Sequence, residues 1–240
     1  MDDPARPVAI PHVDRRTPAP DLTRDRAPKS PLPGQGPLHL PLWLRVVIVL
    51  CCLTEAALLA GPLVGFGGAR SAAFILGGFW SPLLEGVPGL YPGQAWVMFL
   101  SYGLLHAGLL HLAMNLISLA AVGRELGRLI GPGQMALVYL ASQIGAALVF
   151  AAMQPGAGPM VGASGAVFGL AGALVGHAAI TLRRRRRSMT PLVRAVGLIL
   201  GLNIALTLLM PSIAWEAHLG GAATGLILGV IMALTRGRRR

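Results

Sequence analysis

Charged side chains are scarce in this sequence of 240 residues, because Asp, Glu, Lys and Arg together make up only 12% of it. Hydrophobic residues make up 54%, and the mean hydropathy is +0.66. Water-soluble domains carry roughly twice this share of charged residues, ~25%. The composition therefore argues against an ordinary water-soluble domain and predicts a polytopic membrane protein.

Cysteine is almost absent, and the alternating pattern of membrane β-strands is missing. The two cysteines, Cys51 and Cys52, are adjacent within one apolar stretch and are poorly placed for a structural disulfide. The apolar stretches also lack the alternation of polar and apolar residues that a barrel strand requires. A disulfide framework and a β-barrel are both disfavoured.

Long apolar stretches occupy the sequence between Trp43 and Leu234. Most are close to the ~20 residues that a helix needs to cross the hydrocarbon core, and a helix satisfies its own backbone hydrogen bonds in lipid. The expected spans are residues 43–65, 108–127, 133–153, 164–182, 191–210 and 214–235. We therefore predict an all-α polytopic membrane protein with a six-transmembrane-helix bundle. Residues 66–107 are interpreted as a long first loop with interfacial pieces.

The N-terminal region differs from the rest in composition. Residues 1–41 contain 10 of the 19 prolines and all but four of the acidic residues, with no apolar periodicity. We predict that they form a disordered, Pro/Arg-rich cytoplasmic tail. Residues 42–236 are predicted to form the membrane domain, and residues 237–240 a short basic cytoplasmic tail.

Basic residues sort to one side of the predicted membrane domain. With a cytoplasmic N-terminus, the cytoplasmic set is Arg6, Arg15, Arg16, Arg24, Arg26, Lys29, Arg124, Arg128, Arg183 to Arg187, Arg236 and Arg238 to Arg240. The opposite connections hold only Arg70, Glu85 and Glu216. The positive-inside rule then predicts that both termini are cytoplasmic, and we expect a bacterial-type plasma membrane. The net charge of +11 is thus attributed to topology, not to nucleic-acid binding.

Polar residues inside spans need a reason, because a central charge costs ~2.5 kcal/mol or more on insertion scales. The first polar segment contains His106, His111 and Asn115. Residues 111 and 115 are four apart and so share one face of a helix, whereas His106 precedes Gly108 and is expected in the entering loop. These side chains could also serve only as hydrogen-bonding residues in helix packing.

The second polar segment opens the fourth span with Gly162, Ser164 and Gly165. A serine at a helix N-terminus is often only a cap. However, small residues recur along one face at Gly165, Gly169, Gly172 and Gly176, which predicts the close approach of another helix. The stripe supports tight packing first and chemistry second.

The third polar segment lies one turn into the last span, where His218, Gly221 and Gly225 share a face. If the fourth and sixth spans pack through their small residues, Ser164 and His218 meet at the same end of the bundle. Both residues begin spans that run inward, so both are expected toward the non-cytoplasmic side.

Serine beside imidazole is the basic unit of nucleophilic acyl transfer, because the hydroxyl needs a base to accept its proton. His218 would be that base for Ser164, and the oxyanion donors would be the Asn115 amide, a His111 ring N–H and the Ser164 backbone N–H. Glu216 is on a different helical face from His218. We therefore predict a dyad, with no cofactor and no metal ion.

Together the three segments resemble the rhomboid family of intramembrane serine proteases. The family motifs are His-x4-His-x3-Asn, Gly-x-Ser-Gly and His-x2-Gly-x3-Gly, and the matching residues are His106, His111, Asn115, Gly162, Ser164, Gly165, His218, Gly221 and Gly225. The resemblance covers about residues 43–235 and implies a rhomboid-like bundle. By this resemblance Ser164 is the nucleophile, His218 the general base, His111 and Asn115 contribute to the oxyanion site, and His106 supports them.

The resemblance also implies the partners. Family members cut membrane-protein substrates in or near transmembrane segments that unwind easily, and they take water from the non-cytoplasmic side. Two positions differ or lack a partner: Trp96 is followed by Val97 where many members have arginine, and Glu55 lies inside the first span. Glu125 matches an acidic position after the second span and is expected to pair with a nearby arginine.

Three alternatives remain open from the sequence. A catalytically inactive rhomboid-like protein would bind transmembrane clients without cutting them. A small transporter could use His106, His111 and His218 as a proton relay, which leaves the Gly-x-Ser-Gly segment unexplained. The same histidines could bind a metal ion, which also leaves the serine unused.

Overall fold

The computed structural model describes residues 40–209 and 213–236. The predicted tail 237–240 and nearly all of the predicted tail 1–41 lie outside the described residues. The boundaries predicted for these tails therefore remain predictions.

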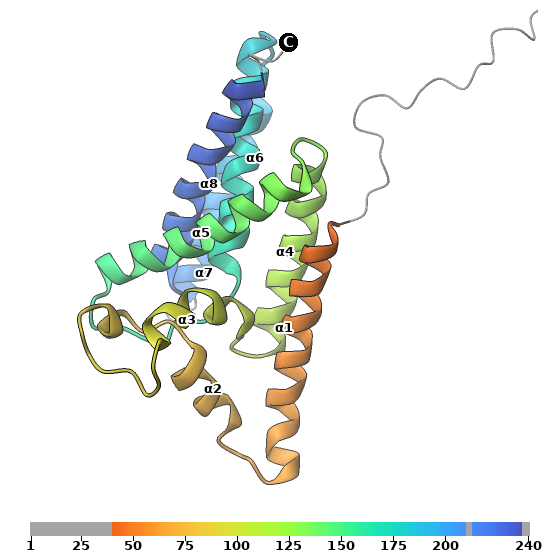
Figure 1. Ribbon diagram of the computed structural model, residues 1–240. Coiled ribbons are helices and arrows are strands. Elements are labelled where there is room, and N and C mark those ends of the chain that lie inside the picture. The colour runs from red at the N-terminus through yellow and green to blue at the C-terminus, as the bar shows by residue number, and fades with distance from the viewer. Residues whose placement is uncertain (1–39, 210–212, 237–240) are drawn as a thin grey trace, which may run out of the picture. The chain divides into compact units, whose positions relative to one another are not determined.

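The described chain is helical and contains no β-strand beyond one isolated bridge between Phe79 and Met160. The helices are α1 Leu42–Ala60, α2 Ala69–Gly77, α3 Gln94–Ser101, α4 Leu109–Gly127, α5 Pro132–Met153, α6 Ser164–Arg184, α7 Thr190–Leu209 and α8 Trp215–Arg236 (Figure 1). Short 3₁₀ segments are η1 Gly61–Val64, η2 Ser81–Leu84 and η3 Tyr102–Leu104. The predicted all-α polytopic fold is confirmed.

Five of the described helices are long and apolar enough to cross a membrane. These five candidate spans coincide with predicted ones, and their bounds are Leu42–Val64, Leu109–Gly127, Pro132–Met153, Ser164–Arg184 and Trp215–Thr235. The remaining predicted span, residues 191–210, corresponds to α7. Its apolar part among the described residues, Thr190–Ala205, is shorter than the others. The chain is thus a multi-pass membrane protein, and the count of six remains a prediction.

The segment between α1 and α4 consists of short helices and turns, as expected for a long first loop. One ion pair ties it to α1. Arg70 on α2 donates hydrogen bonds to both carboxylate oxygens of Glu55, at 2.7 and 3.1 Å, and a third to the backbone oxygen of His106 at 2.7 Å. Glu55 is only 1% exposed, so the guanidinium supplies the partner that this buried carboxylate needs.

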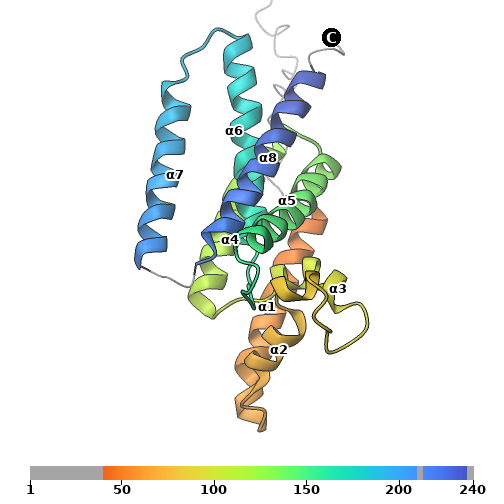
Figure 2. The ribbon, with the colours of Figure 1, turned by 90° about the vertical axis from the view of Figure 1, so that its left-hand side faces the viewer.

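The closest packing in the bundle is between α6 and α8. A methyl group added at Gly221 or Gly225 would overlap the carbonyl oxygen of Gly165 or Gly169, and one added at Gly229 would overlap that of Ala173. The predicted contact between the two small-residue stripes is therefore confirmed. Helix α5 crosses this pair, and α4 lies between α6 and α1 (Figures 1 and 2).

Helix α7 lies at the edge of the bundle, beside α6 (Figure 2). None of its described side chains is buried, and Val193, Leu198, Ile204 and Leu208 are all at least 60% exposed. A helix this apolar and this exposed has lipid as its natural surroundings.

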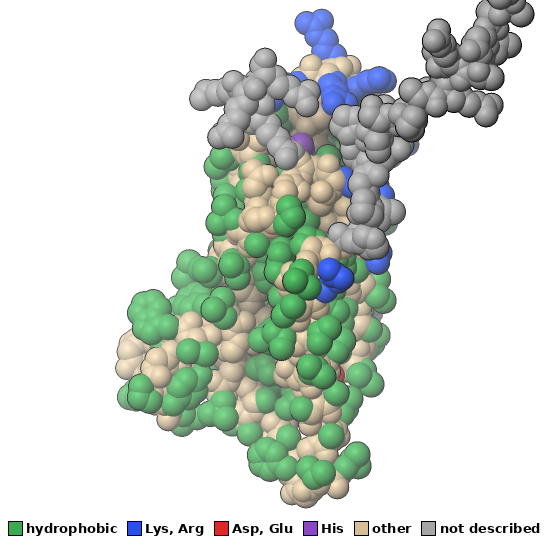
Figure 3. All heavy atoms as spheres, turned by 45° about the vertical axis from the view of Figure 1, so that its right-hand side comes forward, with side chains coloured by type: hydrophobic (Ala, Val, Ile, Leu, Met, Phe, Trp, Pro, Cys, Tyr) green, Lys and Arg blue, Asp and Glu red, His purple; other side chains and the backbone are tan. Residues whose placement is uncertain are grey.

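The two ends of the bundle differ in charge. Hydrophobic side chains cover much of the lower part of the face in Figure 3, whereas Lys and Arg side chains gather in its upper part. Helix α6 ends in this basic region, where Arg184 donates a 2.8 Å hydrogen bond to the backbone oxygen of Ala233 near the end of α8. Because α6 has 21 residues at ~1.5 Å each, Ser164 lies about 30 Å away at the other end.

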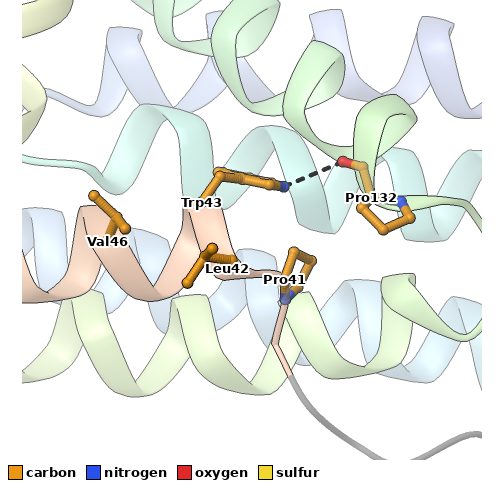
Figure 4. Close-up of a pocket in the computed structure, with 5 residues that line it drawn as sticks. All are labelled: Pro41, Leu42, Trp43, Val46 and Pro132. Carbon is orange, nitrogen blue, oxygen red and sulfur yellow. Dashed lines mark hydrogen bonds between the residues drawn. The ribbon is translucent and has the colours of Figure 1, made fainter.

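A shallow apolar groove lies between the starts of α1 and α5, lined by Pro41, Leu42, Trp43, Val46 and Pro132 (Figure 4). The Trp43 indole N–H donates a 3.2 Å hydrogen bond to the backbone oxygen of Pro132 across it. None of its lining residues belongs to the three polar segments of the sequence, so this groove is separate from the candidate site.

Candidate active site

Ser164 is the first residue of α6, and the backbone before it is held in place by a neighbouring loop. Gly162 has φ of 124°, a conformation that favours glycine. Its N–H donates to the backbone oxygen of Tyr102 at 2.9 Å. Backbone bonding along α6 begins where Val167 N–H donates to Ala163 O at 3.0 Å. The Ser164 N–H therefore points out of the positive end of the helix.

His218 lies in the first turn of α8 and meets Ser164 across the contact between α6 and α8. Its Nε2 is 2.9 Å from Ser164 Oγ, and both side chains are partly buried. The small residues that follow each of them bring the two helix backbones together. Spacing along two stripes thus places a serine and a histidine that are 54 residues apart within hydrogen-bonding distance.

Two further side chains hold the His218 ring, and neither was singled out in the sequence. Phe168 stacks on it with ring centroids 4.4 Å apart and planes at 13°. Asn203 on α7 places its amide nitrogen 2.8 Å from His218 Nδ1. Phe168 follows Ser164 by one helical turn, a spacing that could have identified it. Asn203 is one polar residue in an apolar span, and that rarity is its only signal in the sequence.

His111 and Asn115 lie on α4, and the His111 ring borders Gly162 close to Ser164. A methyl group at Gly162 would be 2.8 Å from His111 Cε1 and 3.8 Å from Ser164 Oγ, so both side chains border the same glycine. His111 Nδ1 accepts a hydrogen bond from the Ala107 N–H at 3.2 Å. In the neutral ring the proton is then on Nε2. This nitrogen also borders Gly162, since it would be 3.0 Å from a methyl group added there.

Asn115 and His106 take up supporting positions. Asn115 is 5% exposed, its Nδ2 donates to the His111 backbone oxygen at 2.9 Å, and its Oδ1 has no protein partner. His106 precedes α4 as expected, with its ring 5.3 Å from the His111 ring. Burial, with a smaller contribution from His111, lowers the pKa of His106 to about 4, so its ring is neutral at pH 7.

Glu216 does not contact His218 in this arrangement. It is 4% exposed and accepts a 2.7 Å hydrogen bond from the side chain of Gln154, at the first turn of α8 where the helix dipole favours a carboxylate. Over residues 40–209 and 213–236, no group of three or more His, Cys, Asp or Glu is placed to hold a metal ion.

The part of the chain that carries Ser164, His218 and α4 matches a known family. The rhomboid domain model matches residues 92–235, which is more than half of the chain and includes every residue of this site. The chain belongs to the rhomboid family.

Named relatives support the same assignment. RHOMBOID-like protein 4 of Arabidopsis thaliana is 36% identical over 135 residues, which cover 56% of this chain and 34% of the plant protein. Rhomboid protease GluP of Bacillus subtilis is 30% identical over 141 residues, covering 59% of this chain and 27% of GluP. Rhomboid-type serine protease 2 of Emericella nidulans is 31% identical over 157 residues, covering 61% and 30%.

This rhomboid chain therefore matches about a third or less of the length of those three relatives. Two of them are named as proteases, which supports intramembrane proteolysis at the level of the family. Rhomboid proteins act on membrane-protein substrates in a bilayer. The reaction of this chain has to be inferred from the residues of its own site.

Two acidic side chains of this rhomboid have arginine partners, one unexpected from the sequence and one as predicted. Glu55, which lacked an expected partner, is paired with Arg70. Glu125 was expected to pair with a nearby arginine, and Arg128 Nη1 is 3.0 Å from its carboxylate at the exposed end of α4.

Proposed function

We propose that this rhomboid is an intramembrane serine endopeptidase in which Ser164 is the nucleophile and His218 the general base. The 2.9 Å contact between His218 Nε2 and Ser164 Oγ carries the proposal. A serine hydroxyl is a weak nucleophile until a positioned base takes its proton, and this distance is within the range for that transfer.

The reaction follows from this pair. Ser164 Oγ forms a bond to the carbonyl carbon of the scissile peptide while its proton passes to His218 Nε2. Collapse of the tetrahedral intermediate breaks the C–N bond, and His218 gives the proton to the leaving amine. Water then attacks the acyl-serine ester while its proton passes to His218, and His218 returns that proton to Ser164 Oγ as the ester C–O bond breaks, which releases the acid and the free serine.

The oxyanion of the intermediate needs donors that are in place beforehand, each worth about 3–4 kcal/mol by deletion. His111 suits this role because its Nδ1 is occupied by the Ala107 N–H, which leaves Nε2–H free to donate. The Ser164 backbone N–H at the start of α6 is a second donor. Asn115 has one amide N–H beyond the one that it donates to the His111 backbone.

The position of the pair also bears on substrate and location. Ser164 and His218 lie at the end of the bundle opposite Arg183 to Arg187, which the positive-inside rule assigns to the cytoplasm. We therefore place the site toward the non-cytoplasmic side of a plasma membrane, with transmembrane segments that unwind easily as substrates. An extended segment is needed because a helical backbone does not expose its carbonyl carbons to Ser164.

Covalent labelling tests the role of Ser164 without a known substrate. The purified protein in detergent is treated with a fluorophosphonate, which reacts with activated serines, and the labelled residue is identified by mass spectrometry. We expect label on Ser164 in wild type and none in Ser164→Ala or His218→Ala.

An exposed serine away from any histidine ring provides the internal control. Ser188 lies in the connection between α6 and α7, where its hydroxyl contacts Thr190. Label on Ser188 equal to that on Ser164, or full labelling of Ser164 in His218→Ala, would contradict an activated serine. That result would favour a rhomboid-like protein that binds transmembrane clients without cutting them.

A further inference from the structure

The His218 ring is contacted on three sides, and a serine–histidine pair accounts for only one of them. Nε2 faces Ser164, the ring face lies against Phe168, and Nδ1 faces the amide of Asn203 at 2.8 Å. Glu216, the nearest acidic residue in the sequence, is bonded to Gln154 instead. An amide from another helix thus stands where a serine protease with a triad has a carboxylate.

Building on the proposed function, we infer that Asn203 is a positioning residue that sets the tautomer and orientation of the His218 ring. For Nε2 to accept the serine proton, the neutral ring must carry its own proton on Nδ1. A group that accepts a hydrogen bond from Nδ1–H favours that tautomer. The amide oxygen of Asn203 is such an acceptor.

An amide differs from a carboxylate because it can support either tautomer. As the side chain stands, Asn203 Nδ2 faces Nδ1, which places the ring proton on Nε2, toward Ser164 Oγ. Rotation of the amide by 180° exchanges its nitrogen and oxygen with little change in shape, and Oδ1 then accepts from Nδ1–H. The second arrangement is the one in which His218 acts as a base, and the only one that suits the doubly protonated ring.

The helix that carries Asn203 gives this contact a further consequence. Among the described side chains of α7, the amide of Asn203 makes the one hydrogen bond that reaches another helix. No described side chain of α7 is buried. The orientation of the catalytic base therefore depends on the position of the least buried long helix in the bundle.

Three variants on one helix test this inference in a cleavage assay. Asn203→Leu removes the hydrogen bond with the same number and branching of side-chain heavy atoms, Asn203→Asp keeps an oxygen facing Nδ1, and Thr207→Val is the matched control. Thr207 lies one turn further along α7, and its hydroxyl donates only within the helix, to the Asn203 backbone oxygen.

We expect Asn203→Leu to lower kcat about tenfold, which corresponds to ~1.4 kcal/mol, with KM within about twofold of wild type. Asn203→Asp should recover most of this loss, and Thr207→Val should cleave like wild type. Wild-type kcat in Asn203→Leu would overturn the inference. So would an equal loss of kcat in Asn203→Asp and Asn203→Leu when both variants melt like wild type.

A spectroscopic measurement separates this inference from the proposed function. Nitrogen chemical shifts of ¹⁵N-histidine report which ring nitrogen carries the proton, and a His218→Gln sample assigns the signals. In a Ser164→Ala background, which cannot turn over, we expect the signals of the His218 Nδ1 and Nε2 nitrogens to change on adding Asn203→Leu but not Thr207→Val.

Each outcome of the two experiments has a distinct meaning. Unchanged His218 nitrogen signals in Asn203→Leu would overturn the positioning role even if the wild type is an active protease. Failure of the wild type to cleave any substrate would refute the proposed function, while the nitrogen signals would still decide whether Asn203 sets the tautomer.

Discussion

Replacement of Gly225 by alanine tests whether the contact between α6 and α8 sets the geometry of the site. An added methyl group at Gly225 would overlap the carbonyl oxygen of Gly169, which is backbone and cannot move aside as a flexible side chain can. The helices must therefore separate or shift. Gly225 is two turns from His218, so the substitution removes no polar group from the site.

The expected cost comes from overpacking, about 1–3 kcal/mol at a well-packed contact. For a chain of this length each kcal/mol changes the melting temperature by about 2–4 °C, so Gly225→Ala should melt about 2–12 °C lower. A shift of ~1 Å between Ser164 and His218 can reduce cleavage about 100-fold. We therefore expect loss of activity at temperatures where the variant is still folded.

Gly197→Ala is the matched control, because a methyl group added there on α7 would have no atom within 4 Å apart from the adjacent backbone of its own helix. Alanine favours the helix over glycine by about 0.5–1 kcal/mol, so this variant should melt at or slightly above the wild-type temperature. Thermal unfolding and cleavage are measured for both variants in the same detergent. Equal melting temperatures and equal cleavage by Gly225→Ala and Gly197→Ala would refute the reasoning.

Three further predictions follow from other parts of the structure. Gly162→Ala should abolish cleavage and lower stability by about 1–3 kcal/mol, because Gly162 has φ of 124° and the added methyl group would press on His111. Substrate cleavage by this variant at the wild-type rate would contradict this. Arg70→Met should destabilise the protein by about 3–5 kcal/mol, because it leaves Glu55 buried without a partner. Adding Glu55→Leu should recover most of the lost stability, and thermal melts that show no recovery would contradict this account. The pKa of His106 is lowered to about 4 in the folded state, so the unfolded state binds more protons between pH 6.5 and 4. Stability should therefore fall by up to about 3 kcal/mol as the pH is lowered across that window. Melting temperatures of His106→Gln should depend less on pH over the same range, and an identical dependence would argue against this origin.

Much of the fold could be predicted because lipid imposes a simple rule on sequence. Apolar stretches of about 20 residues mark spans, and five of the predicted spans coincide with long apolar helices. The close contact of α6 with α8 was also predictable, since Gly165, Gly169, Gly221 and Gly225 recur at helical spacing. The remaining predicted span, residues 191–210, corresponds to α7, and its apolar stretch among the described residues is shorter than the rest.

Contacts between distant segments could not be predicted in the same way. The ion pair of Glu55 with Arg70 depends on how the first loop folds back onto α1, which no periodic pattern records. The contact of Asn203 with His218 depends on the rotation and tilt of α7, an apolar helix whose sequence has little preference for one face. The spacing of Glu216 from His218 predicts a dyad, and no spacing in the sequence relates Asn203 to His218.

The central claim is that Ser164 and His218 hydrolyse a peptide bond of a membrane-embedded substrate. The most direct measurement is cleavage of model single-span substrates with small residues and weakened helices by purified protein in detergent, compared with Ser164→Ala and His218→Ala. The account predicts cleavage by the wild type and none by either variant. Cleavage that survives Ser164→Ala, or no cleavage by the wild type across such substrates, would contradict it.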